Sequence, residues 1–211
     1  MSIRKPPATL AYPNTVSLKA GAIVHRVHDR NFAANDFNPC KGSPTRFAPV
    51  YDAAGECIPS LYAADTLEAA IHETIFHDVP AVAKRKTVPR TLVQSRAHAR
   101  LELLRDLRLV SLRGPDLRRW RIARSLLIGA SPKLYAETAR WASAVHHQFP
   151  EVHGLLWTSN QCDPDTAYLF FGDRVKPENF SITDARDGLF DPSFLSDVRR
   201  AGRRCGVTIT V

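Results

Sequence analysis

Apolar and polar residues alternate along several short segments of the chain, which is the pattern of half-buried β-strands. Residues 23–28 (Ile-Val-His-Arg-Val-His) are the first of these segments. Further strand candidates are residues 58–63, 91–95, 99–103, 107–112, 154–159, 167–171 and 206–211. The runs 154–159 and 167–171 flank Asp163 and Pro164, so we expect a hairpin that turns at this dipeptide.

Helical periodicity marks other segments. The clearest begins at Asp65, a predicted N-cap with Glu68 three residues on, and it ends before Pro80. Its apolar stripe is formed by Leu67, Ala70, Ile71 and Thr74. Further helices are predicted over residues 117–128, over residues 193–204 and from Ser131, where Pro132 occupies the first helical position.

The remaining stretches define the domain organisation. Residues 32–59 are dominated by Asn, Asp, Gly and Pro and predict a long loop, which is unusual in a compact domain unless it has a function. Residues 1–20 have no strong period and are expected to form an N-terminal extension. Residues 21–211 are expected to form a single catalytic domain, in which the tail 176–211 has no assigned role. The sum predicts an α+β fold with a mainly antiparallel central sheet and flanking helices.

Composition fits a soluble protein of this size. The chain has 211 residues, of which 44% are hydrophobic and 24% are charged, so a single domain with a real core is expected. No apolar run approaches the ~20 residues that span a bilayer, and the N-terminus lacks the apolar region of a secretory signal. We therefore expect a cytoplasmic protein with no membrane partner.

Four cysteines are scattered along the chain without a CxxC pair: Cys40, Cys57, Cys162 and Cys205. Single thiols in a chain without a signal are typical of reduced, structurally incidental cysteines. Cys162 lies three residues after Ser159, but no histidine accompanies it in the same motif. We do not expect it to act as a nucleophile.

The formal net charge of +8 suggests an anionic partner. Nucleic acid would need basic residues on a shared face, whereas an anionic small molecule or an acidic protein needs only overall attraction. The basic clusters 84–86, 118–121 and 199–204 are dispersed, and no helix-turn-helix or zinc pattern accompanies them. Solvated surfaces are the first interpretation, partner surfaces the second, and no direct binding of nucleic acid is expected.

Common metal and nucleotide motifs do not match this chain. His72 and His77 resemble the histidines of HExxH, but they are five residues apart and point ~140° from each other on a helix. We therefore expect no catalytic metal. GxGxxG and GxxxxGK[ST] are also absent from the sequence, so arginine and hydroxyl side chains would have to bind any phosphate.

Four polar residues stand beside apolar strand or helix patterns: Arg46, Tyr62, Glu73 and Ser159. A cation, a ring, a carboxylate and a hydroxyl suit an anionic, aromatic substrate that departs through an oxocarbenium-like state. Glu73 lies away from its helix's apolar stripe, with His77 one turn beyond on the same side. Taken singly, each residue also has a structural interpretation: a loop ion pair, a core tyrosine, a solvated carboxylate and a turn serine.

Three motifs in order resemble the RES-domain family, which is named for its Arg, Glu and Ser. The first is Asn38-Pro followed by Thr-Arg-Phe-Ala-Pro, and the second is Leu61-Tyr-Ala-Ala-Asp-Thr-Leu-Glu-Ala-Ala-Ile-His-Glu-Thr. The third is Gly154-Leu-Leu-Trp-Thr-Ser-Asn-Gln followed by Leu-Phe-Phe-Gly-Asp-Arg-Val175. The resemblance runs from about residue 23 to residue 175.

The resemblance implies a fold similar to the ADP-ribosyltransferases and the toxin half of a bacterial toxin–antitoxin pair. It implies an antitoxin partner with an Xre-type helix-turn-helix. The implied activity is cleavage of the nicotinamide–ribose bond of NAD⁺, with water or phosphate as acceptor, so NAD⁺ is a substrate and no cofactor is needed. The family's Arg, Tyr, Glu and Ser correspond to Arg46, Tyr62, Glu73 and Ser159, and Arg26 corresponds to a second arginine that binds NAD⁺.

This assignment agrees with the chemistry of the bond. Nicotinamide is a cationic leaving group, so a carboxylate such as Glu73 that stabilises the ribosyl cation is the main requirement. Arg46 would bind a phosphate, Tyr62 would face the nicotinamide ring, and Ser159 would bond the ribose or the amide. Transfer of ADP-ribose to a protein, a non-enzymatic nucleic-acid-binding module and a homo-oligomer remain open alternatives.

Overall fold

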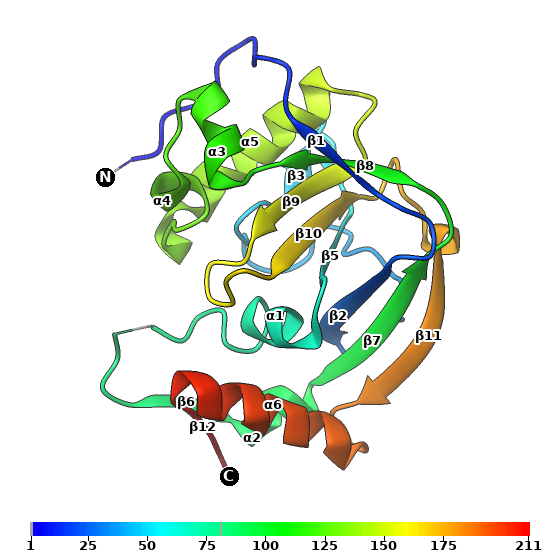
Figure 1. The fold of residues 1–211 in the computed structure, drawn as a ribbon, viewed down its shortest axis with the longest axis vertical. Helices are drawn as coiled ribbons and strands as arrows, with labels where there is room; N and C mark the ends of the chain where they lie inside the picture. The colour runs from blue at the N-terminus through cyan, green and yellow to red at the C-terminus, as the bar shows by residue number, and fades with distance from the viewer. Residues whose placement is uncertain (1, 81) are drawn as a thin grey trace.

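The computed structural model describes residues 2–80 and 82–211, and within them eight strands form one curled sheet (Figure 1). Their order is β1-β8-β9-β10-β5-β2-β7-β11, and neighbours are antiparallel except for the parallel pair of β8 and β9. The strands are β1 (Thr15–Leu18), β2 (Ile23–Asp29), β5 (Ser60–Ala64), β7 (Arg96–Leu103), β8 (Leu107–Ser111), β9 (Gly154–Thr158), β10 (Thr166–Phe171) and β11 (Phe180–Asp187). The predicted α+β class with a mainly antiparallel sheet is confirmed.

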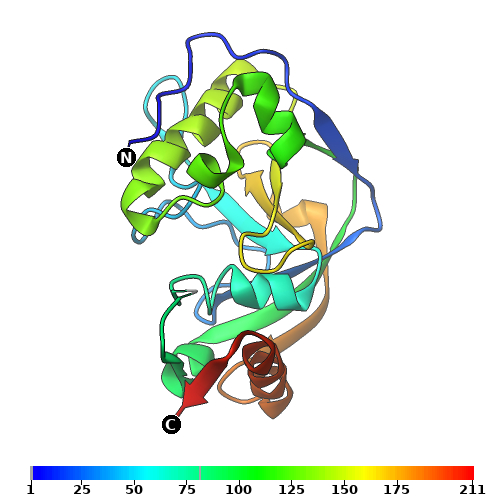
Figure 2. The same cartoon turned by 60° about the vertical axis from the view of Figure 1, so that its left-hand side comes forward.

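Helices flank both ends of this sheet, and the two termini lie at opposite ends of the molecule (Figures 1 and 2). One group, near the N-terminus, is α3 (Gly114–Leu117), α4 (Arg124–Leu127) and α5 (Tyr135–Gln148). The other, near the C-terminus, is α1 (Leu67–His72), α2 (Arg90–Gln94) and α6 (Pro192–Cys205). Short 3₁₀ turns are η1 (Arg118–Trp120), η2 (Pro132–Leu134) and η3 (Pro177–Asn179). None of the helices in the described ranges is both long and apolar enough to cross a bilayer.

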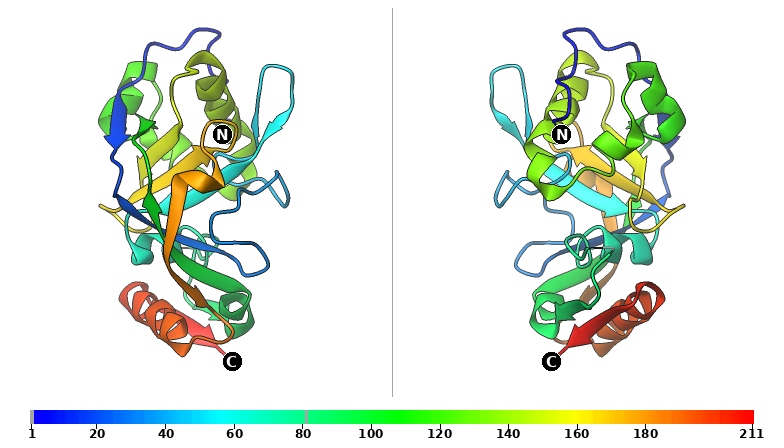
Figure 3. Two further views of the ribbon diagram at one scale, coloured as in Figure 1. Left: turned by 90° about the vertical axis from the view of Figure 1, so that its right-hand side faces the viewer. Right: turned by 90° about the vertical axis from the view of Figure 1, so that its left-hand side faces the viewer.

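Two small strand pairs complete the architecture. A parallel pair joins β6 (Lys86–Pro89) to β12 (Val207–Thr210) beside α6. An antiparallel hairpin joins β3 (Val50–Tyr51) to β4 (Cys57–Ile58) and projects from one side of the molecule (Figure 3). Both pairs lie outside the large sheet.

Strand β10 shows how the core is divided. Its alternating residues Leu169 and Phe171 pack with the helices α3 to α5, whereas Phe170 packs with apolar side chains on the other face of the sheet. Because both faces are covered, every residue of β10 is buried. The free energy of burying these side chains, ~25 cal/mol per Å² of apolar surface, holds the hairpin that carries Ser159 in place.

The described part of the predicted N-terminal extension, residues 2–20, contributes to both the sheet and the core. Strand β1 pairs with β8 in the register Val16 to Leu109. Ile3 and Leu10 are buried in the same apolar cluster as Trp141. The segment therefore covers the helical layer as well as the sheet edge.

Most strand predictions are confirmed, including residues 23–28, the hairpin of β9 and β10, and the final strand. The helix predicted in the tail is also confirmed, as α6. Residues 91–95 were wrongly predicted as a strand, because they form α2. The helix predicted over 117–128 is broken at Arg121, whose left-handed φ of 53° separates η1 from α4. A run of only five residues fits both the helical and the strand periodicity, so tertiary packing decides which structure such a segment forms.

The N-cap of α1 is Thr66, not Asp65. The Thr66 hydroxyl accepts a hydrogen bond from the backbone N–H of Ala69, as an N-cap side chain does. Asp65 instead accepts from the backbone N–H of Thr166 at 2.9 Å, which ties the end of β5 to β10. The prediction that this helix continues to Pro80 is wrong: it ends at His72 with Glu73 as its C-cap, so Thr74 and His77 lie beyond it.

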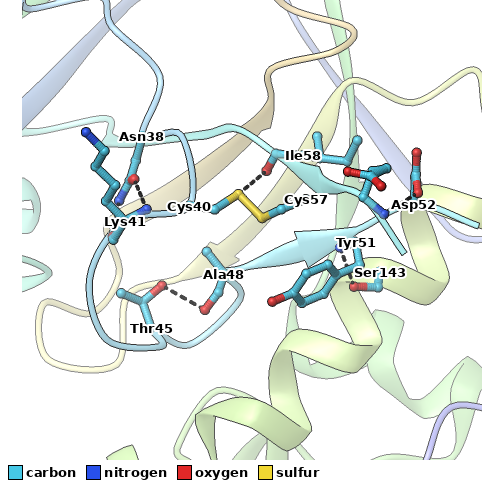
Figure 4. The surroundings of a disulfide bond; sticks show 11 residues. Asn38, Cys40, Lys41, Thr45, Ala48, Tyr51, Asp52, Cys57, Ile58 and Ser143 are labelled. Carbon is cyan, nitrogen blue, oxygen red and sulfur yellow. Dashed lines mark hydrogen bonds between the residues drawn. A yellow bond between two sulfur atoms is a disulfide. The ribbon is translucent and has the colours of Figure 1, made fainter. Parts of the chain in front are cut away.

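The expectation that all four cysteines are reduced is wrong for two of them. Cys40 and Cys57 form a disulfide that joins the long loop to β4 (Figure 4). Cys162 and Cys205 are free thiols. The backbone bridge between Asn38 and Ser60 brings the two ends of this loop together, which spacing along the sequence does not reveal. The closed loop contains Arg46.

Substitution of Cys57 by serine should lower the free energy of unfolding by about 2–3 kcal/mol, because the disulfide closes a loop with a sequence separation of 17. Urea unfolding followed by circular dichroism measures this change. Reductant should lower the free energy of unfolding of the wild type by the same amount and leave the unfolding midpoint of Cys57→Ser unchanged. Coincident midpoints for oxidised and reduced wild type would contradict the prediction.

Candidate functional site

A cavity of about 540 Å³ opens between β2, β5, the long loop and the segment that follows α1. Four of the five predicted site residues line it: Arg26, Arg46, Tyr62 and Glu73. Ser159 is fully buried and lies behind Glu73. The volume of the cavity is typical of a small-molecule site, and the cavity wall carries both arginines and carboxylates.

Glu73 is held by two donors from the end of β9. Its Oε1 accepts the Ser159 hydroxyl at 2.6 Å and the backbone N–H of Asn160 at 3.2 Å. Since Glu73 is the C-cap of α1, its backbone is fixed by the helix as well. The carboxylate therefore has a defined position on the cavity wall.

Ser159 has a different place from the one its motif predicts. Its Oγ donates to Glu73 and accepts the backbone N–H groups of Cys162 at 3.2 Å and Gln161 at 3.4 Å. With no exposed surface, it contacts the carboxylate and not the cavity. In this geometry Ser159 holds the Glu73 carboxylate in place, and the sequence offered no signal for its burial.

The Tyr62 hydroxyl ties the long loop to β5. It accepts the backbone N–H of Phe47 at 3.0 Å and shares a hydrogen bond of 2.9 Å with the Thr45 hydroxyl. Its ring meets Trp157 edge-on, with centroids 6.1 Å apart. Burial raises the pKa of the Tyr62 phenol well above its usual value, so the hydroxyl stays protonated. Tyr62 thus fixes the segment on either side of Arg46.

Arg46 is buried yet incompletely bonded. Its guanidinium donates to the carbonyl oxygen of Ile128 and, at 3.3 Å, to that of Ala130, and it lies 5.4 Å from the centre of the Tyr135 ring. Its Nε has no hydrogen-bond partner among the described residues. A buried donor of this kind costs about 1–3 kcal/mol unless a ligand or water accepts from it.

Arg26 and His28 lie two residues apart on β2, so they face the same side of the strand and both line the cavity. Burial lowers the pKa of Arg26 to about 10, which leaves it charged at neutral pH. Burial and the neighbouring Arg26 lower the pKa of His28 to about 4, so its ring is neutral there. His28 was missed by the sequence reasoning, although its alternation with Arg26 carried the signal.

His77 connects this cavity with a second one of about 510 Å³, because it lines both, as does Arg46. Its ring bonds the Tyr135 hydroxyl at 2.9 Å and the Asp78 carboxylate at 2.9 Å. His77 lies beyond the end of α1, so the turns that follow Glu73, and not the predicted helical spacing, bring it to the cavity. Tyr135, at the start of α5, gave no such indication.

Replacing Ser159 by alanine should lower stability by about 1–3 kcal/mol, because the N–H groups of Gln161 and Cys162 lose their shared acceptor. It should also lower the kcat of the NAD⁺ cleavage that the sequence leads us to expect about 10-fold, with little change in KM, since Glu73 loses one of the two donors that orient it. Thermal unfolding and steady-state kinetics measure the two effects. A KM that rises in proportion would indicate that Ser159 contacts substrate instead.

Comparison with known proteins identifies the family of the chain and a solved structure with a similar fold. The model of the RES domain family matches residues 23–191, beyond the stretch that the sequence motifs indicated. No curated protein matches the chain. A chain in the crystal structure of the M. tuberculosis MbcT-MbcA toxin-antitoxin complex is 13% identical, with a TM-score of 0.61 over 87% of this chain and 92% of that chain. This likeness shows a shared fold.

Proposed function

We propose that this chain, which belongs to the RES domain family, is an enzyme that cleaves the nicotinamide–ribose bond of NAD⁺. The observation that carries this proposal is the oriented carboxylate of Glu73 on a cavity wall that also presents Arg26 and Arg46. A fixed anion beside two cations suits a substrate that is cationic at its reacting carbon and anionic at its phosphates.

Bond cleavage in this cavity needs little acid catalysis. The C–N bond breaks heterolytically, nicotinamide leaves as a neutral molecule with the electron pair, and the ribose carbon becomes an oxocarbenium ion. Glu73 stabilises that positive charge, and Ser159 and Asn160 hold the carboxylate in place before the charge develops. Water or phosphate then adds to the ribose carbon, and its proton is released to solvent.

The arginines would bind the dinucleotide's phosphates. Both guanidinium groups line the cavity: Arg46 donates to backbone carbonyls through Nη1, and Arg26 donates one hydrogen bond through Nη1, to the Ala34 carbonyl at 2.7 Å. Charge-assisted bonds from such donors to phosphate are stronger than neutral ones. Tyr62 is fixed beside Arg46, so its ring is available as a wall of the nicotinamide subsite.

We further propose that this enzyme is the toxin of a toxin–antitoxin pair, with an Xre-type helix-turn-helix protein as its antitoxin. The similar fold in a complex described as toxin–antitoxin supports this role. The formal charge of +8 would favour an acidic antitoxin surface. Expression alone should deplete NAD⁺ and stop growth, and co-expression of the partner should restore both.

Nicotinamide release from NAD⁺ by the purified chain tests the proposal directly. Product analysis separates the acceptors, since water yields ADP-ribose, phosphate yields its phosphorylated form, and protein transfer yields adducts detectable by mass spectrometry. Intact NAD⁺ together with salt-dependent binding of nucleic acid would instead favour the non-enzymatic basic module.

A further inference from the structure

A second group of side chains, outside the cavity of Glu73, brings together three different metal-binding donors. Glu68 and His72 lie four residues apart on α1, so they share one helix face, and Cys162 reaches them from the loop between β9 and β10. One ligand atom from each residue lies within 4.8 Å of the others. His72 and Cys162 are buried, and Glu68 is half-buried.

The donors in this group are incompletely used by the protein itself. His72 is 4% exposed, and its Nδ1 has no hydrogen-bond partner among the described residues. Cys162 is a free thiol whose Sγ donates one hydrogen bond, of 3.5 Å, to Asp165. Glu68 receives one bond from Arg204, at 2.8 Å, through Oε1. A buried imidazole without a partner is costly, and a cation would satisfy it.

We propose that Glu68, His72 and Cys162 bind a zinc ion. A thiolate, an imidazole and a carboxylate are the ligands that Zn²⁺ takes in proteins, and three protein ligands leave a fourth position for water. His72 lines the second cavity, which gives water access to that position. Tetrahedral coordination requires ligand atoms about 3–4 Å apart, so movement of about 1 Å closes the site.

Charge balances when the ion binds. The thiol of Cys162 loses its proton to solvent, because a coordinated thiol is deprotonated outright. The thiolate and the carboxylate of Glu68 then offset the two positive charges of Zn²⁺, while His72 coordinates as a neutral ring. Arg204, which donates to Glu68, and Asp165, which accepts from the Cys162 thiol, place one further positive and one further negative charge beside the site.

The position of the ion would couple it to the Glu73 cavity. Glu73 directly follows His72, and the loop of Cys162 begins with Ser159 and Asn160, which bond Glu73. A zinc ion would therefore clamp α1 to this loop and fix the contact between them. Metal binding itself does not depend on the proposed NAD⁺ chemistry, and the nicotinamide assay reports on that chemistry separately.

Cobalt titration of the full chain, freed of metal with a chelator, tests the site. We expect one Co²⁺ per chain, with a sulfur-to-metal charge-transfer band that Zn²⁺ abolishes by displacement. Cys162→Ser should lose the band and bind at least about 100-fold more weakly. Cys205→Ser is the matched control, because Cys205 is the other free thiol and lies outside the cluster, and it should keep the band.

A second pair of variants covers the case in which Cys162→Ser does not fold. Glu68→Gln should weaken Co²⁺ binding about 10-fold or more, whereas Arg204→Ala, which removes the same ion pair but no ligand, should not weaken it. Absence of Co²⁺ binding to the wild type, a band that persists in folded Cys162→Ser, or equal loss in Glu68→Gln and Arg204→Ala would each overturn the proposal.

Discussion

Substitution of Glu73 by glutamine is expected to slow nicotinamide release from NAD⁺ by roughly 10²–10³-fold. Glutamine keeps an oxygen that accepts from Ser159 and from the backbone of Asn160, so the geometry of the site is retained. What it removes is the negative charge that opposes the developing ribosyl cation. Because this charge acts mainly in the transition state, the loss should appear in kcat and leave KM almost unchanged.

Steady-state kinetics with quantified nicotinamide measure both constants. Glu102→Gln provides the matched control, because Glu102 is a half-buried glutamate on β7 that lines neither cavity. The control should keep wild-type rates and show that loss of one negative charge is not by itself the cause. An unchanged kcat in Glu73→Gln would remove Glu73 from the mechanism and direct attention to Asp36 or Asp78, which line the same cavity.

Long periodic segments were predictable because one physical demand dominates each of them. The hairpin of β9 and β10 is almost entirely apolar, with threonines only at the ends that flank the turn, since both of its faces are buried, and the dipeptide of Asp163 and Pro164 marks the turn. Helix α6 begins with Asp191 as N-cap and Pro192 in its first turn and ends at Gly206, whose φ of 74° suits glycine. In these segments local chemistry and tertiary packing favour the same structure.

Features that depend on contacts distant in sequence were not predictable. The disulfide needs Cys40 and Cys57 to approach in space, and the bridge of Asn38 with Ser60 that aligns their loop is invisible in a linear pattern. The burial of Ser159 depends likewise on Glu73 packing across from it. Residue type indicates which groups can bond, but only the fold indicates which groups meet.

The candidate site was predicted in part for the same reason. The motifs gave the order of Arg46, Tyr62 and Glu73, and the fold brings all three to one cavity. A role for Tyr135 in the site was not predicted, because Tyr135 is the first residue of a helix whose buried face gives it an ordinary packing role. Its hydroxyl bonds His77, a contact between residues 58 positions apart.

Replacement of Arg46 by lysine is expected to lower kcat/KM about 100-fold, chiefly through KM, and to cost about 1–3 kcal/mol of stability. Lysine keeps the charge but cannot donate to the carbonyls of Ile128 and Ala130 and bind a phosphate at the same time. Nicotinamide-release kinetics and urea unfolding measure the two effects on one preparation.

Arg174→Lys separates the structural effect from the effect on substrate binding. Arg174 also donates to backbone carbonyls, at Phe149 and Val152, and lies 5.5 Å from the centre of the Phe171 ring, but it lines neither cavity. Its substitution should lower stability to a similar degree and leave KM unchanged. If Arg46→Lys behaves in the same way, with reduced stability and normal KM, Arg46 anchors the long loop and does not bind the dinucleotide.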